Sequence, residues 1–368
     1  MKWLQNGNLA KLVAFFVIAT VLSCTVSFAA NGWQSFVDDS TNSDKVVSDS
    51  NSNIKNEAND TLANAPEASP IQKYYHGITG LPIDNEKEIA RPLCFVFSSS
   101  DPLYGISSSY LTIEIPTEYG NTRLLCFTDD AKMLGKIGSI SPSRGYISNF
   151  ASYFGGILLS YGTDDNIEYA HMPIEECLDF SKVPGYCYSE YNSFIYTNAD
   201  LVNAFMNNSK VATSQVDRVS LPYAFPKYGN KTELNGNSGN EVLISYSDSN
   251  STMISYSATE ECYYFSKNNG LRNDLLNDKP IKYDNVFIIY SDSTTYESES
   301  TTQLVMDTYT KGSGLYMYGG VYVEMTWERC DDGSLAFYDS NGDKLTVNRG
   351  TSYMAVVKSS AKGSVTVT

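Results

Sequence analysis

Two arginines in the sequence could together bind an anion. Arg123 flanks a β-prone run, and Arg144 falls in the first turn of an expected helix that starts at Ser143. The free N–H groups at a helix N-terminus attract negative charge, and guanidinium groups hold phosphate or carboxylate through paired hydrogen bonds. The two arginines therefore predict a site for a phosphate or carboxylate ligand. The alternative is that both form structural ion pairs with Glu114, Glu118 or aspartates.

The two glutamates are close enough in the chain to serve as a general acid and a general base. Pro116 lies between Glu114 and Glu118, so a helix that would place both carboxyl groups on one face cannot be assumed. The simpler interpretation is one carboxylate at a strand end and one in a turn, either solvated or paired with Arg123. We favour that interpretation, and both glutamates join the predicted anion site only as secondary members.

The histidines and the known motif patterns give no catalytic centre. The chain has two histidines, His76 and His171, and neither lies near a nucleophile motif, a zinc-protease motif or a phosphate-binding loop. Each is expected to be a surface or packing histidine. The sequence therefore assigns no catalytic residue, no cofactor and no metal ligand.

The seven cysteines do not have the spacing of a zinc site. Cys177 and Cys187 are close in sequence and in loop-like surroundings, which makes them the best local pair for a disulfide. Cys94 and Cys126 lie in apolar runs and are expected to be small buried residues. Cys24 follows a serine in a loose lipobox, so it is the predicted attachment point if the protein is lipidated.

The first thirty residues predict export from the cytoplasm. Two lysines near the start precede a nearly continuous apolar stretch from Leu12 to Ala30, which is the secretory pattern. Three outcomes stay open: lipid attachment at Cys24, ordinary cleavage at the small residues around 27–29, or an uncleaved anchor, since the stretch nearly reaches spanning length. Lipidation or an uncleaved anchor would hold the protein at the outer face of the cytoplasmic membrane, and ordinary cleavage would secrete it.

The segment 31–70 and the overall charge limit the kinds of partner. Residues 31–70 are rich in Asn, Ser, Asp and Ala, a composition that cannot bury enough apolar surface to offset its ordering entropy, so they are expected to form a disordered tether. The formal net charge is −16. Since nucleic-acid affinity comes largely from cationic neutralisation of phosphates, nucleic acid is not an expected partner.

The remaining chain predicts two domains. Short β-prone runs at Leu93–Ser98, Tyr110–Ile115 and Thr122–Phe127 precede helical patterns near Ser143 and Asn198, which indicates an α/β or α+β domain over residues 71–215. After a stretch rich in Pro, Gly and Asn at 221–240, strand-prone runs and turn residues alternate without a convincing helix. That pattern predicts an all-β, sandwich-like domain over residues 220–365.

The order of several short motifs resembles the YerB-like lipoproteins of Gram-positive bacteria, a family with two domains of unknown function. The motifs are YHGITGLP from Tyr75, EIPTEYGNTRL from Glu114, IGSISPSR from Ile137 and FYDSNGD from Phe337. The series extends over nearly everything after the tether, although no single motif is diagnostic. The resemblance implies a two-domain protein tethered at the membrane.

The chain departs from the family pattern at several polar positions. Ser141 stands where the family has an arginine, Ser160 where it has a histidine, and Ser193-Phe194 where it has a His-Asn pair. A further family histidine is absent near Asn273. If those polar residues form the family's site, this chain has lost most of it.

These observations predict a non-enzymatic binding or scaffold protein of the bacterial envelope, anchored at the membrane, whose partner is an envelope protein or a wall polymer. The alternative is an envelope enzyme that handles phosphate or lipid pyrophosphate, or a degenerate relative of one, and that uses Arg123 and Arg144. The two arginines can share one anion only if their guanidinium groups lie on the same side and within about 10 Å.

Overall fold

The computed structural model describes most of the chain after the predicted tether. The described residues are 74–84, 90–129, 135–163, 176–213, 220–227, 229–297 and 302–368. Residues 68–368 form one compact unit. The predicted leader and tether, including Cys24, lie outside the described residues, as does His171. No helix in the described ranges is both long enough and apolar enough to cross a membrane.

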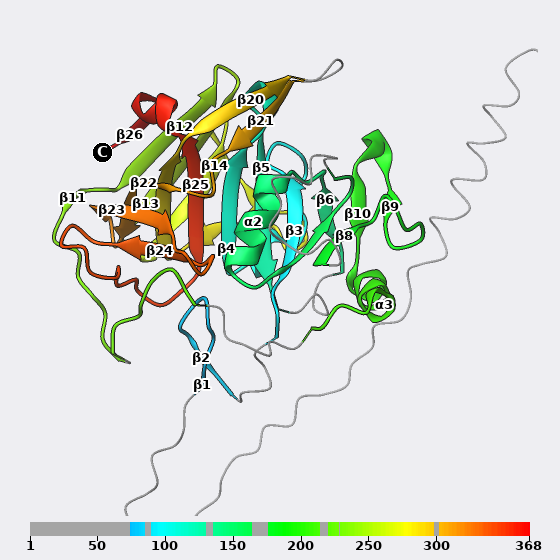
Figure 1. Cartoon of the computed structure of the whole chain (residues 1–368), viewed down its shortest axis with the longest axis horizontal. Helices are drawn as coiled ribbons and strands as arrows, with labels where there is room; N and C mark the ends of the chain where they lie inside the picture. Colours follow the sequence, from blue (N-terminus) through cyan, green and yellow to red (C-terminus); the bar gives the residue numbers. More distant parts are fainter. Residues whose placement is uncertain are drawn as a thin grey trace, which may run out of the picture. The chain divides into compact units, whose positions relative to one another are not determined.

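A mixed β-sheet of fourteen strands dominates the described part of the chain (Figure 1). Its order is β11 (Asn237–Ser238), β23 (Val321–Arg329), β22 (Lys311–Tyr318), β19 (Asn285–Ser291), β25 (Ser352–Lys358), β4 (Leu111–Pro116), β5 (Thr122–Thr128), β3 (Leu93–Ser98), β6 (Ile137–Ile140), β10 (Ile195–Thr197) and β9 (Tyr188–Ser189). Three further strands join it: β24 (Leu335–Tyr338) beside β23, β7 (Ile157–Ser160) beside β3, and β8 (Cys177–Asp179) beside β7.

One strand joins the two halves of the chain. β25 lies between β4 and β19 and runs parallel to both, with Ser352 opposite Leu111 on one side and opposite Asn285 on the other. β25 is buried along most of its length, as parallel strands usually are. The structure therefore does not divide between residues 215 and 220, where the sequence predicts a domain boundary.

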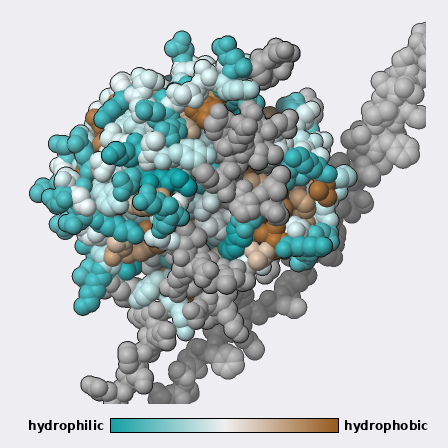
Figure 2. Space-filling view, in the orientation of Figure 1, coloured by the Kyte–Doolittle hydropathy of each residue, from teal (hydrophilic) through white to brown (hydrophobic). Residues whose placement is uncertain are grey.

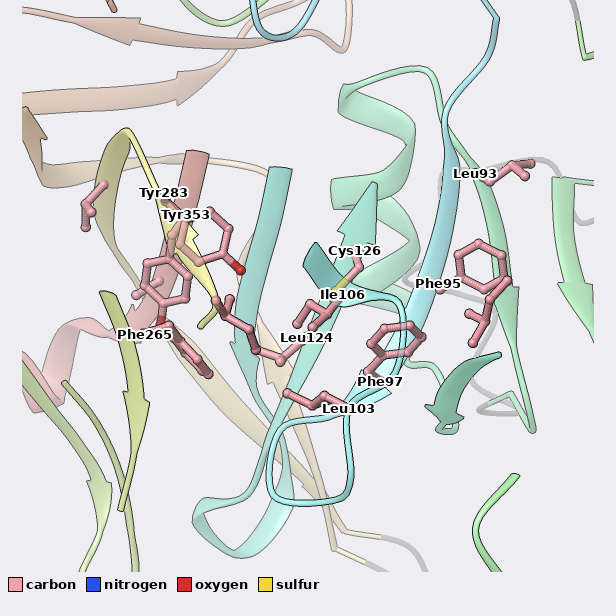
Figure 3. Packing of buried hydrophobic residues seen from close by; sticks show 14 of the residues in the cluster. Leu93, Phe95, Phe97, Leu103, Ile106, Leu124, Cys126, Phe265, Tyr283 and Tyr353 are labelled. Carbon is pink, nitrogen blue, oxygen red and sulfur yellow. The ribbon is translucent and has the colours of Figure 1, made fainter. Parts of the chain in front are cut away.

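A second, smaller sheet packs on one face of the large one. It contains β15 (Gly270–Leu271), β14 (Cys262–Lys267), β13 (Asn250–Ser257), β12 (Glu241–Ser247) and β26 (Val365–Val367), with β18 (Lys282–Tyr283) beside β14. Val242, Ile244 and Phe265 of this sheet share a core with Ile288 and Tyr353 of the large sheet. Figure 3 shows Phe265 beside Tyr353, with ring centroids 5.6 Å apart. The arrangement is sandwich-like.

Two α-helices accompany the sheets. Helix α2 (Gly145–Tyr153) buries Ile147 and Phe150 in a second core with Cys94 and Phe127 of the large sheet, and Figure 1 shows it in front of β4 and β5. Helix α3 (Ala199–Ser209) begins where the sequence predicts, because the Asn198 side chain accepts a hydrogen bond from the Leu201 amide.

The fold is thus predominantly β, as predicted for the second half of the chain. The first half also contributes mainly strands to the shared sheet, so it does not form the separate α/β domain that the sequence indicates.

Three short hairpins lie outside the two sheets: β1 (Tyr74–Tyr75) with β2 (Pro82–Ile83), β16 (Asn273–Asp274) with β17 (Lys279–Pro280), and β20 (Ser293–Glu297) with β21 (Thr302–Met306). The face of the molecule in Figure 2 is mostly hydrophilic where it is coloured, with small scattered apolar patches.

Candidate functional site

The predicted arginine pair lies in one cavity of about 290 Å³, here called the Arg123 cavity. Arg123 and Arg144 line it together with Glu118. Thr117, Tyr119, Asn121, Thr302 and Gln303 complete the lining. Two distant parts of the chain therefore form the cavity: the region from β4 to α2, and the start of β21 in the β20–β21 hairpin.

Arg123 reaches the cavity from the first residues of β5. It pairs with Ile115 of β4 and with Ser98 of β3, in a strand whose other residues are all buried. One guanidinium nitrogen, Nη1, donates a hydrogen bond to the Thr122 carbonyl at 3.3 Å. The Nε atom is buried and has no hydrogen-bond partner.

Arg123 also has no ion-pair partner among the described residues, in contrast to Arg144. Burial, and then the positive charge of Arg144, lower the pKa of Arg123. A guanidinium group nevertheless stays protonated at physiological pH. Arg123 is therefore a partly buried cation whose charge no contacting carboxylate neutralises.

Arg144 occupies a different position from the one the sequence predicts. It is the N-cap residue of α2, with an extended backbone, and the helix begins one residue later at Gly145. Its guanidinium group makes a two-point contact with Glu118, from Nε to Oε1 at 3.0 Å and from Nη2 to Oε2 at 2.8 Å. The alternative prediction, that both arginines form structural ion pairs, therefore holds for Arg144 but not for Arg123.

Glu118 fixes the geometry of the cavity wall. Its Oε1 atom also accepts a hydrogen bond from the Leu304 amide at 3.2 Å, which ties β21 to the turn that carries Glu118. Burial alone would raise the pKa of Glu118, but the hydrogen bonds and charge of Arg144 and the Leu304 amide lower it. A carboxylate held ionised in this way is a poor general base, and its role is positional.

Glu114 does not belong to the cavity, so its inclusion in the predicted site is wrong. Its side chain is 0% exposed and forms an ion pair with Lys267 of β14. Thr122, Thr252 and Tyr353 donate hydrogen bonds to the same carboxylate at 2.6, 2.8 and 2.5 Å. The group joins the two sheets inside the core, where no ligand has access, and Glu114 and Glu118 are not an acid–base pair.

The described histidine is a packing residue, as expected. The Nε2 atom of His76 lies 2.8 Å from Asp129, and its ring packs edge-on against Tyr110 at 4.5 Å. Its Nδ1 atom accepts a hydrogen bond from the Thr79 amide at 3.1 Å. His76 does not line the Arg123 cavity.

The cysteines do not form the predicted disulfide. Cys177, in β8, and Cys187, just before β9, are not disulfide-bonded in the structure. Cys94 and Cys126 are buried, as their apolar surroundings predict. Across the described residues there is no group of three or more side chains arranged to hold a metal ion.

Most of the positions that depart from the family pattern gather around a different cavity, of about 460 Å³. Ser193 and Phe194 line it, Ser141 sits between two lining residues, and Ser160 precedes the lining residue Tyr161. Asn273 lies apart from them in the β16–β17 hairpin. In this chain the cavity is lined by Asp101, by serines and by aromatic and aliphatic side chains.

Sequence reasoning missed part of the Arg123 cavity. Tyr119 is 85% exposed and adopts a left-handed backbone conformation (φ 59°), a local feature that a glutamate–tyrosine–glycine turn gives no reason to expect. Thr302 and Gln303 come from a hairpin far along the chain. No local signal in the sequence relates that hairpin to the β4–β5 turn.

Comparison with known proteins identifies a similar fold. Residues 242–354 match the family described as "Protein of unknown function (DUF3048) C-terminal domain". The crystal structure of YerB from Bacillus subtilis is similar, with a TM-score of 0.67 and 18% sequence identity, over 80% of this chain and 100% of that one. No curated protein matches the sequence significantly. The chain thus has the fold of YerB, and its residues 242–354 match the C-terminal domain model of DUF3048, which confirms the resemblance to the YerB-like proteins.

Proposed function

We propose that this chain is a non-enzymatic binding protein of the bacterial envelope that holds an acidic group of its partner in the Arg123 cavity. The observation that carries the proposal is the state of Arg123. This guanidinium group is partly buried, has no ion pair among the described residues and has a buried Nε without an acceptor. A buried donor without a partner is costly, and a charged one more so. An anionic ligand would supply the missing acceptor and the missing charge.

The rest of the cavity supports binding more than catalysis. Glu118, the carboxylate in the lining, is held by both hydrogen bonds from Arg144, and the lining contains no histidine, lysine or cysteine. An acid or base near neutrality and an activated nucleophile are the usual requirements for transfer chemistry. Binding needs only the cation and its neighbouring hydroxyl and amide groups.

The location outside the cytoplasm is part of the proposal and rests on the sequence alone. Two lysines precede the apolar stretch from Leu12 to Ala30, a pattern that directs export. Protease added to intact cells should digest the protein if it lies at the outer face of the membrane. Protection under these conditions, together with recovery in the cytosolic fraction, would contradict this part.

The second candidate is an envelope enzyme that acts on phosphate or lipid pyrophosphate, and one observation favours it. Arg123 and Arg144 line the same cavity. The enzyme hypothesis requires the two guanidinium groups to lie on the same side of the molecule. Incubation of the purified protein with inorganic pyrophosphate or an isoprenyl pyrophosphate, followed by phosphate release, separates the candidates. Turnover that Arg123→Met abolishes would support the enzyme and refute the binding protein.

The binding proposal is tested by thermal unfolding of the purified protein with added sodium phosphate or citrate at fixed ionic strength. An anion bound at Arg123 raises the melting temperature, because a ligand that binds only the folded state stabilises it in proportion to the logarithm of its concentration. Arg123→Met should abolish this rise. It should not lower the melting temperature without the anion, since methionine fills a similar volume without an unpaired charge.

A matched control removes one positive charge elsewhere. Lys231 is 68% exposed and does not line the cavity, so Lys231→Met should leave the anion-dependent rise unchanged. If the anion raises the melting temperatures of Arg123→Met and Lys231→Met by the same amount, the anion acts through general charge screening, and Arg123 is not a binding residue.

A further inference from the structure

We infer that the ligand of the Arg123 cavity is an acidic sugar, a saccharide unit that carries a phosphate or a carboxylate. The inference rests on the proposed function and adds the class of ligand. The acidic group binds at Arg123, and one face of the sugar ring packs on Tyr119. Three features of the cavity carry it: an exposed aromatic ring, a turn whose fixed backbone carries that ring, and a lining of hydroxyl and amide groups.

Tyr119 is the most exposed large hydrophobic residue in the described chain, at 85%, and it lines the same cavity as Arg123. So exposed a ring, in the same cavity as a cation, leaves its face accessible to a ligand. Tyrosine provides a wide contact area with few rotatable bonds, so it binds at a low entropy cost. The C–H face of a pyranose ring is a surface that an aromatic ring can cover.

The turn that carries Tyr119 is fixed in place. The Thr117 amide donates to the Asn121 carbonyl at 2.7 Å, and the Asn250 side chain donates to the Gly120 carbonyl at 2.7 Å. Gly120 has a positive φ of 73°, and a Cβ atom there would lie 2.5 Å from the Cβ atom of Ser247. The backbone that carries the ring is therefore fixed before a ligand arrives, which removes part of the ordering cost of binding.

The remaining lining suits a hydroxylated ligand and not a lipid. Thr117, Asn121, Thr302 and Gln303 contribute hydroxyl and amide groups, and the lining has no aliphatic residue. Such groups can both donate and accept hydrogen bonds, as sugar hydroxyl groups do.

The test is a binding titration of the purified protein, followed by calorimetry or by NMR. The probes are glucose 1-phosphate and glucuronate, which combine a ring with an acidic group, sn-glycerol 3-phosphate, which has the acid without the ring, and glucose, which has the ring without the acid. Both acidic sugars should bind about tenfold more tightly than glycerol phosphate, the size of one aromatic contact. If only glucuronate binds, the ligand class narrows to carboxylated sugars. If only glucose 1-phosphate binds, it narrows to phosphorylated sugars.

The variants separate this inference from the proposed function. Tyr119→Ala should reduce the affinity for acidic sugars to that for glycerol phosphate and leave glycerol phosphate binding unchanged, whereas Tyr119→Phe should retain the preference. If glycerol phosphate binds as tightly as the sugars, or if Tyr119→Ala has no effect, the anion site stands and the sugar inference is refuted. If none of the acidic probes binds, or if Arg123→Met binds them as well as the native protein, the proposed function itself fails.

Discussion

Replacement of Lys267 by methionine should destabilise the protein strongly and reverse the pH dependence that Glu114 contributes. The Glu114 carboxylate is 0% exposed, and Lys267 is its ion-pair partner. After the substitution three hydroxyl donors remain, from Thr122, Thr252 and Tyr353, but the charge has lost its counter-ion. Removal of one partner from a buried pair costs about 3–5 kcal/mol. For a protein of this size that corresponds to a fall in melting temperature of about 5–15 °C.

The direction of the pH effect follows from the pKa of Glu114. Burial acts to raise this pKa, but Lys267 and the hydrogen bonds outweigh burial and lower it from the ordinary value of 4.5. In the native protein, Glu114 therefore contributes stability that is present above pH 4.5 and is lost as the pH falls through the lowered pKa. Without Lys267, burial raises the pKa above 4.5 in the folded state, so the stability of the variant should decrease as the pH rises through that range.

Urea unfolding between pH 3 and pH 8 measures both effects, because the native protein loses stability below pH 4.5 and the variant above it. The double variant Glu114→Gln/Lys267→Met is the control: it removes both charges, so it should recover much of the lost stability and show no pH dependence from this site. The reasoning is refuted if Lys267→Met costs less than about 1 kcal/mol, or if its stability rises with pH as that of the native protein does.

Three further predictions concern the packing and the thiols. Gly156→Ala should cost about 1–3 kcal/mol in chemical unfolding, because the new Cβ atom would lie 2.1 Å from the Cys94 Sγ atom; an unchanged midpoint would contradict the packing described at α2. Tyr316→Phe should cost about 1–3 kcal/mol, because its hydroxyl group donates to Asn285 and accepts from the Asn348 amide, both at 2.9 Å in the core; a neutral effect would show that these groups find other partners. No cysteine in the described residues forms a disulfide in the structure, so alkylation of the denatured, unreduced protein should modify all six of them, and a mass that changes on reduction would reveal a disulfide.

Local features of the fold could be predicted from the sequence. The β-prone runs 93–98, 241–247 and 335–338 coincide with β3, β12 and β24, because each is a short run rich in aliphatic and aromatic residues between turn residues. The helix signal at Asn198 is correct because one side chain satisfies the first free amides. The run 344–347, in contrast, makes only isolated bridges.

Long-range pairing could not be predicted in the same way. The sequence divides the chain at a stretch rich in Pro, Gly and Asn, but no local pattern indicates that β25 inserts beside β4. The same limit applies to the candidate site. Arg123 and Arg144 could be proposed from their residue type, whereas the contact of Glu118 with the Leu304 amide depends on a hairpin 186 residues away. Glu114 was misassigned for this reason, since Lys267 is 153 residues distant.

The position of β25 has a consequence for the order in which the molecule can be completed. Tyr353 on this strand meets Glu114 across 239 residues of sequence, and in the sheet β25 lies between β4 and β19, which do not pair with each other. During synthesis β4 and β19 emerge before β25, so each has an unpaired hydrogen-bonding edge until β25 is made. Closure over so long a loop is slow, so the nascent chain stays without its finished sheet until these late residues arrive. A chain released before residue 352 would expose two apolar edges and should aggregate or be degraded.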